Sequence, residues 1–386
     1  VAEACQSRRR MSRRTPREAV SLAAEAASVW FRHNLVQPLR SQPGLPRAMH
    51  YISTHRCNAR CVMCGIWKET GARAEELSAQ ALGGILDDRL FSKMEFVGIS
   101  GGEPFLRDDL SDLCGVFLEK CTRIKRFSLT TNGLLTGRMS TVLPEIAQRA
   151  RETGALLDVS VSVHAMGEDL DGIFGVENAF GKIERTIEVL EDFRDEGQLS
   201  FSLNCVLLSE NLDGAEELKK WAAGRGIPLS FVIGEHRTRF RTEGLDEAFV
   251  APDGQEQLIQ FLRNLGEDRS QSGVSAGKYR EIAAILEGRK TRSLSCYYAM
   301  GGLLLGHDGR LFYCSHSKEI GSCRDRAPWD IYHDPKNLGY RNLNLLQAEC
   351  FHCPPYTRTR WEMEKDLPRT LADIVRHKLP RSERSL

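Results

Sequence analysis

Short apolar stretches alternate with amphipathic helical patterns between residues 48 and 233, and this alternation narrows the possible folds most. The expected strands are Met49–Thr54, Glu95–Ser100, Arg126–Thr131, Leu157–Val163, Ser200–Leu207 and Leu229–Ile233. The expected helices are Ser78–Asp88, Asp108–Lys120, Gly137–Thr153, Asn178–Glu196 and Asp213–Arg225. Strands that alternate with helices predict a parallel sheet, and right-handed crossovers curl it into a barrel. We therefore expect an α/β fold, a partial (β/α)6 TIM-like barrel.

Three cysteines crowd the segment after the first expected strand. Cys57, Cys61 and Cys64 have the spacing C-x3-C-x2-C, which lets three thiolates converge on one inorganic centre. Cubane iron–sulfur clusters are normally held by four cysteines, so three leave one iron open to a small chelating molecule. A zinc site or a group of redox thiols is the alternative. Zinc requires four ligands, and no further cysteine completes this loop; His55 lies too close in the chain to project freely.

A second motif, Ser100-Gly101-Gly102-Glu103-Pro104, ends the second expected strand. Together the two motifs resemble the radical S-adenosylmethionine (radical SAM) superfamily. The resemblance implies that the three cysteines bind a [4Fe–4S] cluster, whose open iron is chelated by the methionine amino and carboxylate groups of S-adenosylmethionine (SAM). It further implies that the reduced cluster cleaves SAM to a 5′-deoxyadenosyl radical, which abstracts a substrate hydrogen.

The resemblance also suggests which residues contact SAM. Met63 stands where the family usually has an aromatic residue, whose backbone approaches adenine. Gly101 and Gly102 would leave room for the backbone to meet the methionyl ammonium, and Glu103 would offer a charged acceptor. Candidates for the carboxylate, the ribose and the rest of the pocket are the polar residues Thr131, Asn132, Ser162, Ser202 and Asn204. For each, a buried polar residue satisfied by backbone groups is an equal alternative.

A second set of cysteines occurs in residues 291–360. Asp308-Gly309 predicts a hairpin turn between Gly301–Leu305 and Arg310–Tyr313. This hairpin would bring Cys296 and Cys314 together, and Cys350-x2-Cys353 would supply two more thiolates. We therefore expect a small C-terminal cysteine-rich module of β-hairpin and helix.

This module resembles the SPASM and twitch modules of radical SAM enzymes. Thr359 stands where a SPASM module continues with further cysteines, so the smaller twitch module, as in 2-deoxy-scyllo-inosamine dehydrogenase, is the better match. The resemblance implies that Cys296, Cys314, Cys350 and Cys353 bind a second, auxiliary [4Fe–4S] cluster. A zinc ribbon is the alternative, since four thiolates suit both metals.

Changes in composition divide the chain into five expected parts. These are a basic tail with an amphipathic helix (1–47), the barrel core (48–240), a helical linker (241–290), the cysteine-rich module (291–360) and a basic C-terminal tail (361–386). The linker should contain helices at Gln255–Leu265 and Lys278–Glu287. For the basic run at residues 8–14, we favour a solvated tail over a nucleic-acid or membrane contact.

Composition excludes several classes of protein. The chain is 41% hydrophobic and 27% charged with a net charge of +1, so it has no global attraction to nucleic acid or to anionic membranes. No apolar run reaches the ~18 residues of an integral membrane helix, and no secretion signal is evident. Seven of the cysteines fall into metal-ligand spacings, which favours a reducing, cytoplasmic compartment.

The residues that act on a substrate are less clearly marked. Glu235, His236 and Arg237 follow the last expected strand, over the barrel mouth, and could bind a polyol or phosphate or accept a proton. A solvated charged loop is the alternative. Cys323 could donate a hydrogen atom to a substrate radical, which would make the protein an epimerase.

These expectations converge on an oxidoreductase. The deoxyadenosyl radical would remove hydrogen next to a hydroxyl or amine of a small polar substrate, such as a sugar or aminocyclitol. A base would take the proton, the auxiliary cluster would take the electron, and a flavodoxin or ferredoxin would reduce the SAM cluster. Modification of a ribosomally made peptide is the second enzymatic alternative. The alternative from another class is a non-catalytic iron–sulfur electron-transfer protein, which would leave the Gly-Gly-Glu motif unexplained.

Overall fold

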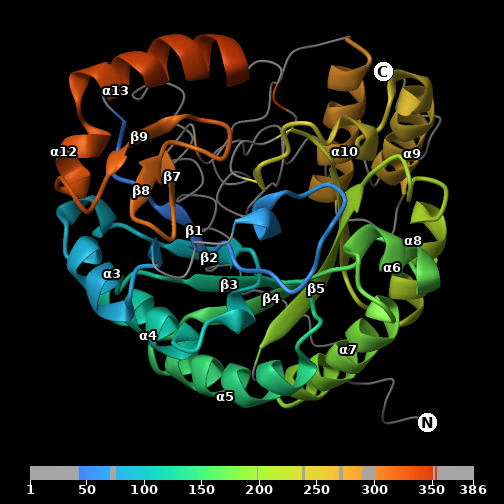
Figure 1. The fold of residues 1–386 in the computed structure, drawn as a ribbon, viewed down its shortest axis with the longest axis horizontal. Coiled ribbons are helices and arrows are strands. Elements are labelled where there is room, and N and C mark those ends of the chain that lie inside the picture. The colour runs from blue at the N-terminus through green and yellow to red at the C-terminus, as the bar shows by residue number, and fades with distance from the viewer. Residues whose placement is uncertain are drawn as a thin grey trace, which may run out of the picture.

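A curved sheet forms the centre of the computed structural model, which describes residues 43–69, 75–197, 199–236, 240–268, 273–288, 298, 301–350 and 353 (Figure 1). Its strand order is β6-β5-β4-β3-β2-β1-β7-β8-β9. The first six strands are all parallel and are β1 (Ala48–Thr54), β2 (Phe96–Gly101), β3 (Arg126–Thr131), β4 (Leu156–Ser162), β5 (Ser200–Leu207) and β6 (Leu229–Ile233). The predicted α/β partial barrel is confirmed.

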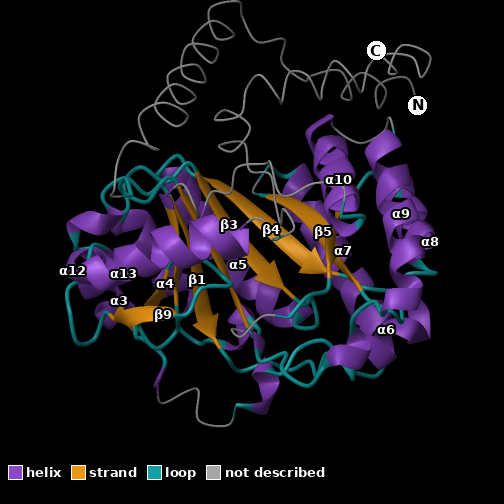
Figure 2. Ribbon diagram, turned by 90° about the horizontal axis from the view of Figure 1, so that it is seen from above, coloured by secondary structure: helices purple, strands orange, loops and turns teal. Residues whose placement is uncertain are grey.

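Helices cover the outer side of this sheet, as Figures 1 and 2 show. They are α3 (Ala79–Leu86), α4 (Leu110–Lys120), α5 (Thr136–Glu152), α7 (Ala179–Asp195) and α8 (Ala215–Gly224). In β3, β4 and β5 every second residue is buried, because side chains alternate between the two faces of a strand. Phe127, Val159 and Leu203 are fully buried in the core on this side, while the residues between them face the barrel interior.

One helix in the barrel was not expected. The helix α6 (Gly167–Phe174) follows β4 and ends at Gly175, whose φ of 60° gives the left-handed C-cap that favours glycine. The Asp171 carboxylate accepts hydrogen bonds from the backbone N–H groups of Asn178 (2.6 Å) and Ala179 (2.7 Å), at the start of α7. Because of this connection, α6 is held in a fixed position at the end of the barrel strands.

The predicted C-terminal hairpin is present and extends the main sheet. Strand β7 (Gly302–Leu305) pairs in parallel with β1, and β8 (Arg310–Phe312) and β9 (Glu319–Ser322) continue the sheet in antiparallel fashion. The predicted helices of the linker form α9 (Gln255–Glu267) and α10 (Gly273–Leu286), which pack together. After β9 come α12 (Pro328–Tyr332), α13 (Pro335–Tyr340) and the π-helix η9 (Arg341–Glu349).

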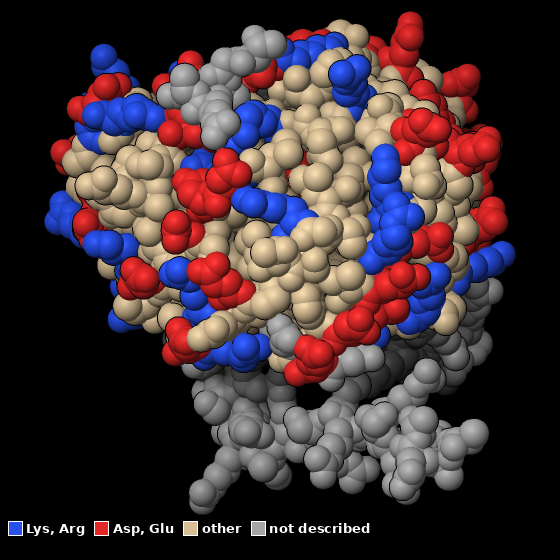
Figure 3. Space-filling view, turned by 60° about the horizontal axis from the view of Figure 1, so that its bottom comes forward, with Lys and Arg blue, Asp and Glu red and all other residues tan. Residues whose placement is uncertain are grey.

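Short 3-10 turns connect several elements: η3 (Ile66–Lys68), η4 (Arg89–Phe91), η5 (Pro104–Leu106), η7 (Asp246–Ala248) and η8 (Pro252–Gly254). The basic run and the amphipathic helix expected in the N-terminal part, and the basic C-terminal tail (361–386), lie outside the described residues. Among the described helices, none has the length and apolar character needed to cross a membrane. On the face shown in Figure 3, basic and acidic side chains are interspersed, in keeping with the net charge of +1.

Candidate functional site

The cysteine loop, residues 57–64, lies between the end of β1 and η3. Its first sulfur, Cys57 Sγ, accepts weak hydrogen bonds from the Ala59 backbone N–H (3.5 Å) and from Asn132 Nδ2 (3.7 Å). All three cysteines are partly buried. The loop therefore opens beside the C-terminal end of β3, where Asn132 lies.

Two distant segments hold this loop. The backbone N–H groups of Arg60 and Val62 donate to the carbonyls of Phe174 (2.7 Å) and Ile173 (3.0 Å), at the end of α6. At the other end of the loop, the Gly65 N–H donates to the Phe240 carbonyl (2.8 Å). A side chain at position 65 would lie 2.2 Å from the Arg241 carbonyl oxygen, so this close approach needs glycine.

The loop fits an iron–sulfur cluster better than a single zinc ion. The three sulfur atoms do not form a set within 4.8 Å of one another, whereas two histidine–carboxylate sets in the described part of the chain do. Thiolates around one zinc ion, at Zn–S distances of about 2.3 Å, would lie about 3.8 Å apart. A cluster spreads its thiolates over separate irons.

The thiol pKa values also fit a positively charged ligand. Burial raises the pKa of Cys57 to about 11 and raises that of Cys61 well above its usual range, and repulsion from the neighbouring thiols adds to both. A bound iron centre supplies the positive charge that allows such thiols to bind as thiolates. Residues Cys57, Cys61 and Cys64 thus have the chemistry to hold a [4Fe–4S] cluster.

The glycines after β2 bring two backbone segments together. The Gly102 N–H donates to the Thr54 carbonyl (2.7 Å), and the Glu103 N–H donates to the Arg56 carbonyl (2.8 Å). An added Cβ would lie 2.4 Å from the Thr54 oxygen at Gly101, where φ is 132°, and 2.1 Å from the Arg56 oxygen at Gly102. The glycines therefore let β2 approach the segment that enters the cysteine loop. Their contact with SAM stays a prediction.

Glu103 is fully buried and accepts three hydrogen bonds. The donors are Thr131 Oγ1 (2.9 Å), the Asn132 N–H (2.8 Å) and the Phe105 N–H (3.1 Å). Burial raises the pKa of Glu103 to about 7. The carboxylate thus ties the end of β2 to the end of β3 and is used within the chain, which the sequence did not indicate.

Asn132 links these strands to the cysteine loop. Besides contacting Cys57, its Nδ2 donates to Asn58 Oδ1 (2.8 Å). Met63 is nearly buried, at 9% exposure, and belongs to the main apolar core. Asn58 is a further site residue that sequence reasoning missed, since no local pattern pairs it with a residue at the end of β3.

Polar side chains share the inner face of β4 and β5. Ser160 lies opposite Ser202, and Ser162 lies opposite Asn204. Asn204 Nδ2 donates to Ser160 Oγ (3.0 Å), and Ser162 Oγ donates to Asn204 Oδ1 (3.4 Å). All four side chains are partly exposed, so the inner face keeps hydrogen-bonding capacity for a ligand.

Two of the three predicted residues after β6 are described. Glu235 Oε1 lies 3.6 Å from Nε2 of His316, a residue of the C-terminal segment. His236 is half exposed, and its Nε2 pairs with Asp246 at 3.0 Å. Arg237 lies outside the described residues. The structure therefore connects Glu235 to the segment that follows β8 and turns His236 toward η7.

His164, at the end of β4, is structural. It is 5% exposed, its Nδ1 accepts the Val206 N–H (3.2 Å), and burial lowers its pKa to about 3. Cys114, Cys121 and Cys205 are likewise buried in the core. All four side chains thus pack in the interior of the barrel.

The C-terminal cysteines are described in part. Cys314, Cys350 and Cys353 are partly buried, whereas Cys296 lies outside the described residues, so their convergence stays a prediction. Cys323 lines an open hollow of about 530 Å³ between α3 and the segment before α12. Burial raises the pKa of its thiol to about 12. The described part of the structure gives Cys323 no contact with the cysteine loop.

Comparison with known proteins gives a family match for the barrel. Residues 51–222 match the family model described as Radical SAM superfamily. The chain is 26% identical to the GTP 3′,8-cyclase of Peptoclostridium acidaminophilum, over 71% of this chain and 82% of that protein. It is also 26% identical to the mycofactocin maturase MftC of Mycolicibacterium smegmatis, over 62% of this chain and 57% of that protein. The chain thus spans little more than half of the maturase.

Among solved structures, native anSMEcpe with bound AdoMet and Cp18Cys peptide is similar in fold. The TM-score is 0.57 with 16% identity, covering 86% of this chain and 99% of that one. At this identity the likeness concerns the fold alone. None of the relatives named here is 2-deoxy-scyllo-inosamine dehydrogenase, so that finer resemblance stays a prediction.

Proposed function

We propose that this chain, which belongs to the radical SAM superfamily and is a radical SAM enzyme, oxidises a small polar substrate on the inner face of its barrel. One observation carries the proposal. The cysteine loop contacts Asn132 at the end of β3, and the next two strands of the sheet, β4 and β5, carry small polar side chains on their inner face. These are the hydroxyl and amide groups of Ser160, Ser162, Ser202 and Asn204.

When bound, the cluster on Cys57, Cys61 and Cys64 supplies the electron that cleaves SAM to methionine and a 5′-deoxyadenosyl radical. The chain's own residues position the reactants. Asn132 fixes the strand end beside Cys57, while Glu103 holds Thr131 and Asn132 in place. Met63 adds an apolar contact at the edge of the loop.

The inner face favours a polyol, a sugar or an aminocyclitol. Hydroxyl and amide side chains both donate and accept hydrogen bonds, so they match a ligand that carries several hydroxyl or amino groups. Asp158 lies on the same face of β4 and accepts a hydrogen bond from Ser200 Oγ (2.7 Å). A carboxylate at this position would suit an amine on the substrate.

Oxidation requires that one hydrogen atom, one proton and one electron leave the substrate. The hydrogen atom on carbon passes to the deoxyadenosyl radical and gives 5′-deoxyadenosine. We assign the hydroxyl or amine proton to Glu235, which lies beside His316. Cys296, Cys314, Cys350 and Cys353 would hold a second cluster that could accept the electron, and a flavodoxin or ferredoxin would return the electron that SAM cleavage consumes.

A ribosomal peptide is the second candidate substrate. It is favoured by the relatives, which include a maturase and a structure with a bound peptide. The two candidates differ in a simple binding measurement. A peptide-modifying enzyme would bind a precursor peptide. An aminocyclitol or sugar dehydrogenase would instead form more 5′-deoxyadenosine when the small molecule alone is added.

The experiment that tests the core of the proposal is a count of iron, sulfide and zinc per chain after anaerobic reconstitution. The chain is compared with a variant in which Cys57, Cys61 and Cys64 are all alanine. About eight irons should fall to about four, because each cubane cluster holds four. If about four irons fall to none and one zinc remains, the C-terminal cysteines form a zinc site, and the second cluster is excluded as electron acceptor.

A single substitution then tests the role of the second cluster. Cys350→Ala should keep SAM cleavage, which needs only the first cluster, and should lose substrate oxidation. Full turnover by this variant would exclude the second cluster as electron acceptor. Solvent deuterium in the recovered substrate without net oxidation would instead indicate epimerisation, and Cys323→Ala would be the next variant.

A further inference from the structure

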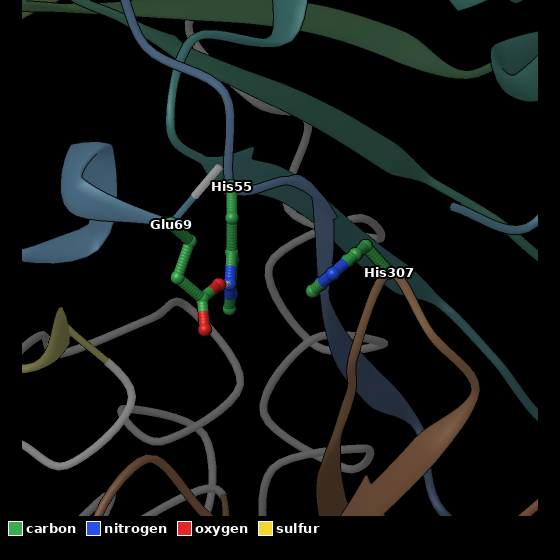
Figure 4. Close-up of side chains that lie close together, drawn as sticks. All are labelled: His55, Glu69 and His307. Carbon is green, nitrogen blue, oxygen red and sulfur yellow. Dashed lines mark hydrogen bonds and ion pairs between the residues drawn. The ribbon is translucent and has the colours of Figure 1, made fainter. Parts of the chain in front are cut away.

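Two histidines and a carboxylate meet beside the cysteine loop. His55 follows β1, Glu69 follows η3, and His307 lies in the turn between β7 and β8 (Figure 4). One ligand atom of each lies within 4.8 Å of the other two. The two imidazole rings have centroids 4.0 Å apart, and His55 Nδ1 is in hydrogen-bond contact with the Glu69 carboxylate. No local pattern groups these residues, because His307 lies about 240 residues after Glu69 in the chain.

One ring nitrogen of His307 lacks a hydrogen-bond partner in this cluster. The residue is 3% exposed, yet its Nε2 has no hydrogen-bond partner among the described residues. A buried polar atom without a partner costs about 1–3 kcal/mol, so such atoms usually mark a missing ligand. Figure 4 shows the His307 ring directed toward His55 and Glu69.

We propose that His55, Glu69 and His307 bind a divalent metal ion of the zinc class, separate from the iron–sulfur clusters. Two imidazoles and a carboxylate are ligands that Zn²⁺ and neighbouring transition-metal ions prefer. An ion between His55 and Glu69 would take the place of the contact that their side chains make with each other. His307 also belongs to a second close set, with Glu75 and Asp308.

Basic side chains at the edges of the cluster do not fill it. Arg241 pairs with one oxygen of Glu69, and Arg310 pairs with Asp308 Oδ2 at 2.7 Å. Arg241 occupies Oε1 of Glu69, and His55 faces Oε2, which is the oxygen that an ion would bind in place of His55. Both oxygens of Asp308 already contact Arg310, so the charge balance of the ion would come from Glu69, with the imidazoles as neutral donors.

The position of the ligands indicates what the ion would do. His55 and Glu69 stand on either side of the cysteine loop, at its beginning and its end, and His307 belongs to the hairpin that extends the sheet. A metal ion shared by the three would close the loop at its base and fix it to β7 and β8. Closing a chain segment in this way reduces the entropy of its open states.

The test is zinc binding by the reconstituted, desalted protein, equilibrated anaerobically with Zn²⁺ in a chelator buffer. Zinc and iron per chain are measured together, so that zinc that displaces iron from cysteines is recognised by a fall in iron. We expect the wild-type chain to bind one more zinc than His307→Gln at equal iron content. The melting temperature should rise with Zn²⁺ in the wild type and stay constant in the variant.

Two further variants keep the result unambiguous. His333→Gln is the control, since His333 is a partly buried histidine of the same C-terminal segment that stacks on Trp329, outside the proposed ligand set; this variant should bind zinc as the wild type does. Glu69→Gln should also weaken zinc binding. Because it leaves the buried His307 in place, it provides the test if His307→Gln fails to fold. Equal zinc at equal iron in the wild type, His307→Gln and Glu69→Gln would overturn the proposal and leave the cluster a hydrogen-bonded histidine pair. The outcome is independent of the substrate reaction, because no cluster cysteine is altered.

Discussion

Gly102 shows how one missing side chain shapes the site. Its N–H meets the Thr54 carbonyl, and an added Cβ would lie 2.1 Å from the Arg56 oxygen, a backbone atom that cannot rotate away. Gly102→Ala should therefore push the segment before Cys57 away from β2. We expect a loss of about 1–3 kcal/mol in stability, as for overpacking elsewhere, together with reduced iron per chain.

The control for Gly102→Ala is Gly84→Ala in the exposed interior of α3. Nothing lies within 4 Å of a Cβ there, so the substitution should stabilise the helix by up to about 1 kcal/mol. Thermal unfolding and iron analysis of both variants check the prediction. If Gly102→Ala matched the wild type in melting temperature and iron, the close approach would not be a constraint.

Glu103 should make stability depend on pH. Burial raises its pKa to about 7 in the folded chain, above the ordinary value of 4.5, so the folded state binds this proton more tightly than the unfolded state does. The stabilisation is complete below the unfolded pKa and is lost as the pH rises through the folded pKa. Glu103→Gln removes this titration. The melting temperature of the variant should therefore shift upward relative to the wild type between about pH 5 and about pH 8. A difference that stays constant across this range would refute the assigned pKa.

At the scale of elements, α6 supports the cysteine loop. Its last carbonyls accept the Arg60 and Val62 N–H groups, and a Cβ on Gly175 would lie 3.1 Å from the Arg60 Cβ. Gly175→Ala should therefore both strain the left-handed C-cap, by about 1 kcal/mol, and displace the loop. We expect iron in the first cluster to fall. The count is made in a Cys350→Ala background, which removes one proposed ligand of the second cluster.

Gly154→Ala separates backbone strain from loop displacement. Gly154 follows α5 with φ of 75°, close to the 60° of Gly175, and nothing lies within 4 Å of its Cβ. Both variants should lose similar stability, and Gly175→Ala alone should lose iron. Equal iron in the two variants would mean that α6 does not position the loop.

These elements show what local sequence could and could not predict. The six barrel strands were predicted within about one residue, in part because β3, β4 and β5 alternate apolar and polar residues for their full length, whereas the short strand β9 was not predicted. The helix α6 was missed because Gly167–Phe174 is short and contains two glycines, so its pattern is that of a loop. Its bonds to the cysteine loop span more than one hundred residues and leave no trace in local periodicity.

At the scale of the molecule, the cysteine spacing predicted the position of the candidate cluster loop after β1 but not the residues that lie beside it. Residues at strand ends, such as Thr131 and Asn132, were placed correctly by the topology of the barrel. The contact of Glu103 with SAM stays a prediction; the hydrogen bonds that its carboxylate accepts from Thr131 and Asn132 were not predicted, because they depend on how the second and third strands end side by side. The contact of His307 with His55 and Glu69 could not be predicted from the sequence, because it depends on how the hairpin pairs with β1.

This junction leads to a prediction about the whole molecule. Strand β1 is bonded to β2 on one side and to β7 on the other, so the hairpin closes an edge that the barrel strands would otherwise expose. The amides of Ala48–Thr54 and Gly302–Leu305 should therefore exchange with deuterium together, at a rate set by opening of the whole sheet. Strand β9, at the outer edge, should exchange faster and serves as the internal reference. Peptide-level hydrogen exchange under anaerobic conditions measures all three segments in one sample.

If β7 exchanged as fast as β9 while β1 stayed protected, the cysteine-rich segment would open as a separate unit. A common exchange rate for β1 and β7 would mean that the hairpin and the barrel sheet open as one cooperative unit. A substitution at the C-terminal cysteines that destabilises the hairpin would then also destabilise the cysteine loop, which follows β1.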